Sequence, residues 1–112
     1  MNIETLMKGV GPAERLLKLM ANRHRLMILC ALGEGEKSVG AICALIGLSQ
    51  SAVSQHLSRM RGEGLVRTRR EAQTVYYALA SREVAAVIDL LERLYCAAPA
   101  ASRVLPLNER TP

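Results

Sequence analysis

The sequence is poor in aromatic residues: its 112 residues include three tyrosines and no phenylalanine or tryptophan. Its hydrophobic residues, 50% of the total, fall in short periodic runs rather than in any stretch long enough to span a bilayer. We therefore expect a single domain with no membrane segment. Because large side chains are scarce, we also expect the apolar faces near both ends of the chain to complete their core with a second copy, as a homodimer.

The sequence also lacks the usual signatures of enzymes and secreted proteins. It has no nucleophile elbow, phosphate-binding loop or paired carboxylates. Its two histidines, His24 and His56, do not belong to a cluster of thiolates and imidazoles of the kind that soft or borderline metals prefer. We therefore expect no enzyme, no metal site and no cofactor. With no secretory signal and three cysteines that are expected to be reduced, we expect a cytoplasmic protein.

What the sequence does contain is a helix, a tight turn and a second helix. Residues 39–46 are largely apolar, Gly47 can adopt the left-handed conformation that ends a helix, and Ser49 can cap the next one. In that second helix Val53 and Leu57 lie on an apolar face, and the opposite face is polar. A turn of about three residues is typical of a helix-turn-helix, so the polar face is predicted to read the major groove of DNA. The alternative is that this face is simply solvated.

A basic hairpin is predicted to follow the second helix. Its arginines, on or before the turn, can contact backbone phosphate beside the groove, and they position a protein rather than read sequence. The formal net charge of +5 agrees with a polyanionic partner. The side chains predicted to contact double-stranded DNA are Gln50, Ser51, Ser54, Gln55, His56, Arg59, Arg67, Arg69 and Arg70.

Further amphipathic helices are expected at residues 3–20, 23–32 and 82–96, and the first is expected to be broken or delayed by Gly9, Gly11 and Pro12. The predicted fold is mainly α with a small β-hairpin: a winged helix-turn-helix of five helices that dimerises through its first and last helices. We expect residues 1–96 to form the DNA-binding and dimerisation domain and residues 97–112 to form a flexible tail.

Three stretches together resemble the ArsR family of bacterial winged-helix repressors: Leu16 to Leu29, Ile46 to Leu57 and Gly64 to Leu79. The resemblance covers about residues 14–96. Two departures are visible, since Arg23 stands where the family often has proline, and Ala72-Gln73 occupies the tip of the wing, where glycine is common. The resemblance implies a dimer that binds an imperfectly palindromic operator.

Members of this family differ in what they sense. One familiar metal site uses a Cys-x-Cys pair, and the matching positions here are Ser38 and Gly40. A second familiar site uses Asp and His ligands of the last helix, and the corresponding positions hold Ser81, Glu83 and Leu94. Neither set suits zinc, so a metal sensor of either kind is not expected.

The placement of two cysteines resembles the branch of the family that senses persulfides and related reactive sulfur species. In that branch, cysteines of the second and last helices are joined by a disulfide or polysulfide bridge, which implies the pair Cys30 and Cys96 here. Bridging would release operator DNA. Two alternatives stay open: a non-standard cysteine site for arsenite or a thiophilic metal, which could include Cys43, or inert cysteines that act as small buried hydrophobes.

Overall fold

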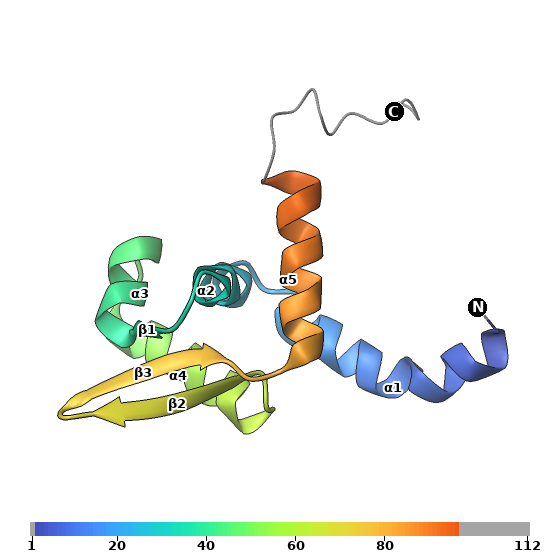
Figure 1. Ribbon diagram of the computed structural model, residues 1–112, viewed down its shortest axis with the longest axis horizontal. Helices are drawn as coiled ribbons and strands as arrows, with labels where there is room; N and C mark the ends of the chain where they lie inside the picture. Colours follow the sequence, from blue (N-terminus) through green and yellow to red (C-terminus); the bar gives the residue numbers. More distant parts are fainter. Residues whose placement is uncertain (1, 97–112) are drawn as a thin grey trace.

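The computed structural model describes residues 2–96 and shows a winged helix-turn-helix (Figure 1). The described residues form five helices and a three-stranded antiparallel sheet in the order β1-β3-β2. The predicted fold class is confirmed. The elements are α1 (Ile3–Met20), α2 (Arg23–Gly33), β1 (Lys37–Ser38), α3 (Val39–Ile46), α4 (Gln50–Gly62), β2 (Val66–Glu71), β3 (Thr74–Leu79) and α5 (Arg82–Tyr95).

Short polar side chains begin every helix. Each accepts a hydrogen bond from backbone amides of the first turn that would otherwise have no partner, and these residues are Asn2, Asn22, Ser38, Ser49 and Ser81. Gly47 ends α3 with φ of 75° and ψ of 26°, in the left-handed region where a side chain is unfavourable. The predicted end of α3 and start of α4 are therefore both confirmed, with three residues between the two helices.

The expectation that Gly9, Gly11 and Pro12 interrupt the first helix is wrong. Helix α1 is continuous through all 18 of its residues, with Pro12 inside it. Proline removes the amide that would bond the carbonyl of Lys8, but every residue from 2 to 15 is exposed, so water can bond that carbonyl instead. One missing hydrogen bond is insufficient to end the helix.

The sheet contains a strand that the sequence analysis did not predict. Strand β1 pairs with β3 through Lys37 opposite Tyr77 and Ser38 opposite Tyr76. Strands β2 and β3 form the predicted hairpin, with Val66 opposite Leu79 at its base and Glu71 opposite Thr74 near its tip. The wing is thus joined by β1 to the segment that leads into α3.

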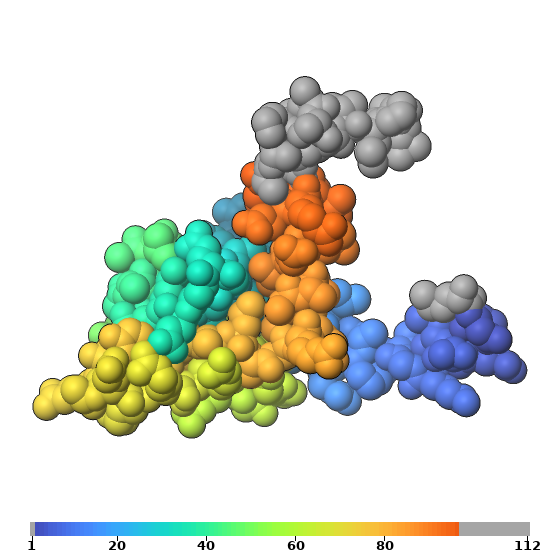
Figure 2. Space-filling view, viewed as in Figure 1, coloured from blue at the N-terminus to red at the C-terminus, as the bar shows by residue number. Residues whose placement is uncertain are grey.

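The core lies where α2, α3, α4 and α5 meet the base of the wing. Its side chains are at most 5% exposed and include Ile28, Leu29, Ile42, Leu57 and Val84. Helix α1 joins this core only through its carboxyl end, at Leu16, Leu19 and Met20, and the rest of it projects away from the body (Figures 1 and 2). None of the helices within residues 2–96 is long and apolar enough to cross a membrane.

The projecting half of α1 and the outer face of α5 expose apolar side chains. On α1 the large ones are Ile3, Leu6, Met7, Val10 and, nearer its carboxyl end, Leu17; on the outer face of α5 they are Leu90 and Leu94. Isolated exposed apolar residues are ordinary, but a helix that carries several of them and packs on little else is typical of an interface.

Candidate DNA interface and dithiol site

Helix α4 is held at the surface by its apolar face. Val53, Leu57 and Met60 are fully buried, while Ser49 caps the amino end by accepting a hydrogen bond of 3.2 Å from the amide of Ala52. The helix contains two arginines and no acidic residue. Its outward face is therefore polar and positively charged, as contact with a nucleic acid requires.

The predicted base-reading residues of α4 do not all lie on that outward face. Gln50, Ser51, Gln55 and Arg59 are exposed, as predicted, but Ser54 and His56 are half-buried. The His56 ring lies 6.0 Å from that of His24 at the start of α2.

Burial lowers the pKa of His56 most, and the charges of Arg25 and His24 lower it further, so that the imidazole is neutral at pH 7. This placement favours a role for His56 in packing α4 against α2. Ser58 was not among the predicted contacts, yet it is exposed three positions after Gln55 and so shares its face.

The three wing arginines differ in their surroundings. Arg69 donates from Nε to both carboxylate oxygens of Glu36, at 3.1 and 3.2 Å, and its guanidinium carbon lies 4.7 Å from the centre of the Tyr76 ring. The hydrogen bond from Arg69 is also the main cause of a lowered pKa for Glu36. Arg67 and Arg70 are exposed and form no ion pair with another described residue. Arg69 therefore stabilises the junction between the wing and the loop before β1 through its contacts with Glu36 and Tyr76.

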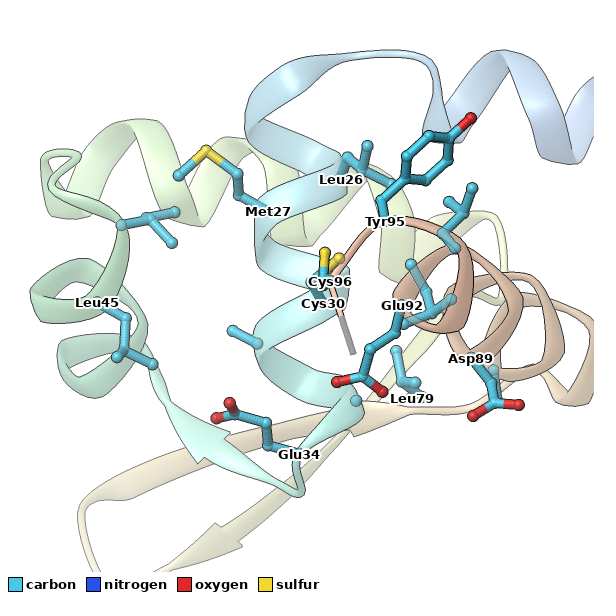
Figure 3. A pocket seen from close by; sticks show the side chains of 16 residues that line it. Leu26, Met27, Cys30, Glu34, Leu45, Leu79, Asp89, Glu92, Tyr95 and Cys96 are labelled. Atoms are coloured by element: carbon cyan, nitrogen blue, oxygen red, sulfur yellow. The ribbon is translucent and has the colours of Figure 1, made fainter. Parts of the chain in front are cut away.

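Cys30 and Cys96 line the same cavity, between α2, α3 and α5 (Figure 3). Its volume is about 690 Å³. Cys30 is placed there by the helical repeat, because it shares a face of α2 with Leu26 and Met27, which lie four and three residues earlier and also line the cavity. Cys96 caps the carboxyl end of α5, where its amide donates to the carbonyl of Glu92 at 2.8 Å. Residues 66 positions apart in sequence are thus brought to one site.

Both of these cysteines are exposed, so Cys30 is not the small buried hydrophobe that its apolar neighbours suggested. The pKa of Cys30 is raised, first because the cavity walls remove water from the thiol, and then because a thiolate would face the charges of Cys96 and Glu92. Cys30 is therefore mainly a thiol at neutral pH, and its thiolate becomes abundant only in more alkaline solution.

Cys43 lies elsewhere, half-buried on α3 and packed against the core. It is not among the residues that line the cavity of Cys30 and Cys96. Within residues 2–96 no three His, Cys, Asp or Glu side chains are grouped so that they could hold a metal ion. The three-thiolate arrangement that arsenite usually requires is thus not formed by these cysteines in the described chain.

Comparison with known proteins identifies the family. Residues 22–68 match the family model described as "Bacterial regulatory protein, arsR family". The chain is 55% identical over 98 residues to the transcriptional activator HlyU of Vibrio cholerae, covering 88% of this chain and 91% of that protein. The chain belongs to the ArsR family. It is a DNA-binding transcriptional regulator rather than an enzyme.

Solved structures support the same assignment for the fold. A structure described as reduced HlyU from Vibrio cholerae superposes with a TM-score of 0.79 at 54% identity, covering 84% of this chain and 99% of that one. The transcriptional repressor BigR from Xylella fastidiosa superposes with a TM-score of 0.81 at 36% identity, covering 88% of this chain and 100% of that one. The similar proteins thus include one named as an activator and one named as a repressor. DNA binding and homodimerisation are typical of this family.

Proposed function

We propose that this regulator is a repressor that binds operator DNA while Cys30 and Cys96 are thiols and releases it when persulfide or polysulfide joins them in a disulfide or polysulfide bridge. The observation that carries this proposal is the shared cavity, because it places two exposed thiols of distant segments at one site. One of the similar structures is described as reduced HlyU, so a redox state is named for a similar protein.

The DNA contacts follow from exposure and charge. The exposed part of α4 would enter the major groove, with Gln55 and Arg59 as the residues best suited to read base edges. Arg67 and Arg70 would contact phosphate, and Arg69 would contribute less because Glu36 already neutralises it. Ser54 and His56 are half-buried, so only the exposed part of each side chain would contact DNA.

The operator-binding unit is proposed to be a homodimer formed by α1 and α5. These two helices carry the exposed apolar side chains described above, and burying them against a second copy would remove that surface from water. A two-fold dimer presents two copies of α4 to successive half-sites of an imperfect palindrome. We propose that residues 1–96 contain both the DNA-binding surface and the dimerisation surface. The predicted flexible tail, 97–112, lies outside the described residues.

The switch would act through α5. A bridge between Cys30 and Cys96 ties the end of α5 to α2, while the outer face of α5 contributes to the proposed dimer. A change in the setting of α5 would therefore alter the spacing of the two α4 helices. A coupling of about 1.5 to 3 kcal/mol would weaken DNA binding by roughly 10- to 150-fold.

The bridging reaction needs no metal. One thiolate attacks the outer sulfur of a persulfide, forms a protein persulfide and releases the donor as a thiol. The second cysteine attacks the inner sulfur of the protein persulfide, which closes a disulfide and releases hydrogen sulfide. A second donor molecule supplies the additional sulfur of a trisulfide, since two protein thiols and two persulfides give one trisulfide, two donor thiols and one hydrogen sulfide.

The test is to treat the protein anaerobically with excess glutathione persulfide and to measure intact mass, peptide connectivity and operator binding on one sample. A Cys30 to Cys96 bridge with at least tenfold weaker DNA binding is expected. The matched controls are Cys43→Ser, which should respond like the parent protein, and Cys30→Ser, which should bind DNA but ignore the persulfide. Loss of the response in Cys43→Ser, or a bridged protein with unchanged DNA affinity, would show that the proposal is wrong.

A further inference from the structure

The walls of the dithiol cavity are mostly hydrocarbon. Leucine, isoleucine, alanine and methionine side chains of α2, α3 and α5 line it, together with the two cysteines (Figure 3). Its volume of about 690 Å³ is much larger than two thiols need, so a small molecule can enter beside them. An apolar reagent would lose water on entry and gain contact with these walls.

Among residues 2–96, the charged residues around the cavity are all acidic. Glu34, Asp89 and Glu92 line it, and no lysine, arginine or histidine of that described part of the chain does. Glu34 is paired with Lys37 at 3.3 Å and Asp89 with Arg93 at 3.2 Å, so both are partly neutralised. Glu92 has no ion pair within residues 2–96.

Glu92 is also near the reactive sulfur. Its charge contributes to the raised pKa of Cys30, and its carbonyl accepts the amide of Cys96. A carboxylate at this place would repel an anionic reagent that approaches either thiol, whereas a neutral reagent would not be affected. The cavity therefore combines a favourable surface for apolar molecules with an unfavourable field for anions.

We propose that the dithiol takes sulfur from neutral, apolar sulfane-sulfur donors, of which dialkyl trisulfides are the test case, in preference to anionic donors of the same size. This inference rests on the proposed function, because it specifies the substrate class of the same pair of cysteines. It differs from that proposal in what it predicts: a ratio of reaction rates rather than an effect on DNA.

The reaction balances with the trisulfide as oxidant. One cysteine thiolate attacks the central sulfur of the donor, so that a mixed trisulfide forms and one alkyl thiolate leaves. The other cysteine attacks that same sulfur, and the second alkyl thiolate leaves. Two protein thiols and one dialkyl trisulfide thus yield one protein trisulfide and two alkyl thiols, with the donor reduced by the two electrons that the cysteines lose.

The test compares dipropyl trisulfide with bis(2-carboxyethyl) trisulfide, which is similar in size but anionic at pH 7. The rate of bridge formation in the full-length protein is measured by mass spectrometry for each reagent. The ratio of the two rates is then divided by the same ratio for a small uncharged cysteine derivative, so that differences in intrinsic reactivity cancel. We expect the protein to favour the dipropyl compound by about tenfold or more.

Two variants separate charge from shape. Glu92→Gln should reduce the preference by about threefold, because it removes one negative charge beside the thiols. Ala85→Leu, which would fill part of the cavity, should slow the dipropyl reaction. A normalised ratio near one, or one that favours the anionic reagent, would overturn the inference. If both reagents bridge the cysteines at the expected ratio but DNA affinity does not change, the proposed regulatory function fails while the donor preference stands.

Discussion

The proposed dimer gives the sharpest prediction, and Leu6 is the residue with which to test it. Leu6 lies on the part of α1 that projects from the body and is 44% exposed. Burying a whole leucine stabilises by about 1.5 to 3 kcal/mol, so burying its remaining exposed part contributes about 1 kcal/mol. A two-fold interface contains the residue twice, and Leu6→Ser is therefore expected to cost about 2 kcal/mol of dimerisation free energy, or about 30-fold in the dissociation constant.

Sedimentation equilibrium measures this constant directly. The matched control is Leu45→Ser, because Leu45 is 60% exposed but lies on α3, outside the proposed interface. Operator binding at low protein concentration should weaken for the Leu6 variant and not for the control, since only the dimer contacts both half-sites. Unchanged dimerisation of Leu6→Ser, or an equal loss in both variants, would refute the assignment of α1 to the interface.

Three further predictions concern the wing and the cavity. Arg70→Ala should reduce the slope of log affinity for DNA against log salt concentration by about 1.8, or about 0.9 for each copy of Arg70 in the proposed dimer. Arg69→Ala should change that slope by less than half as much, and equal effects would contradict the pairing of Arg69 with Glu36. Ala72, at the tip of the wing, has φ of 55°, so Ala72→Gly should raise the free energy of unfolding by about 0.5 to 1 kcal/mol in a denaturant titration, and a decrease would argue against strain there. Glu92→Gln should lower the pKa of Cys30, because a negative neighbour that disfavours the thiolate is removed; the rate of Cys30 alkylation against pH measures this, and a midpoint that stays in place would exclude the contribution of Glu92.

Much of the fold could be predicted because its signals are local. Gly47 ends α3 through its own backbone conformation, and Ser49 caps α4 through atoms three residues away. The resemblance to the family, carried by short motifs, was confirmed by relatives that cover most of the chain. Strand β1 was missed because it has only two residues and depends on pairing with β3, about 40 residues later. The prediction at Pro12 was wrong because the one hydrogen bond that proline removes does not outweigh the others along the 18-residue helix.

In the candidate site too, the sequence identified residue types, but the contacts between them form only when the chain folds. The sequence identified the arginines of the wing, but not that Glu36 and Tyr76 hold one of them, because these residues meet only when the sheet forms. It assigned His56 to a polar face, yet the packing of α2 against α4 turns that ring toward His24.

The sequence by itself determined the local elements of this protein: helix caps, the tight turn, the apolar faces and the basic hairpin all follow from residues a few positions apart. Only the tertiary structure decided which side chains of those elements meet in one site. Cys30 and Cys96 line one apolar cavity with an acidic rim because α2 and α5 pack together. Cys43 is left out of it because its side of α3 packs against the core, whereas Leu45 and Ile46 of the same helix line the cavity. Side-chain contacts across long sequence separations depend on packing, which periodicity does not encode.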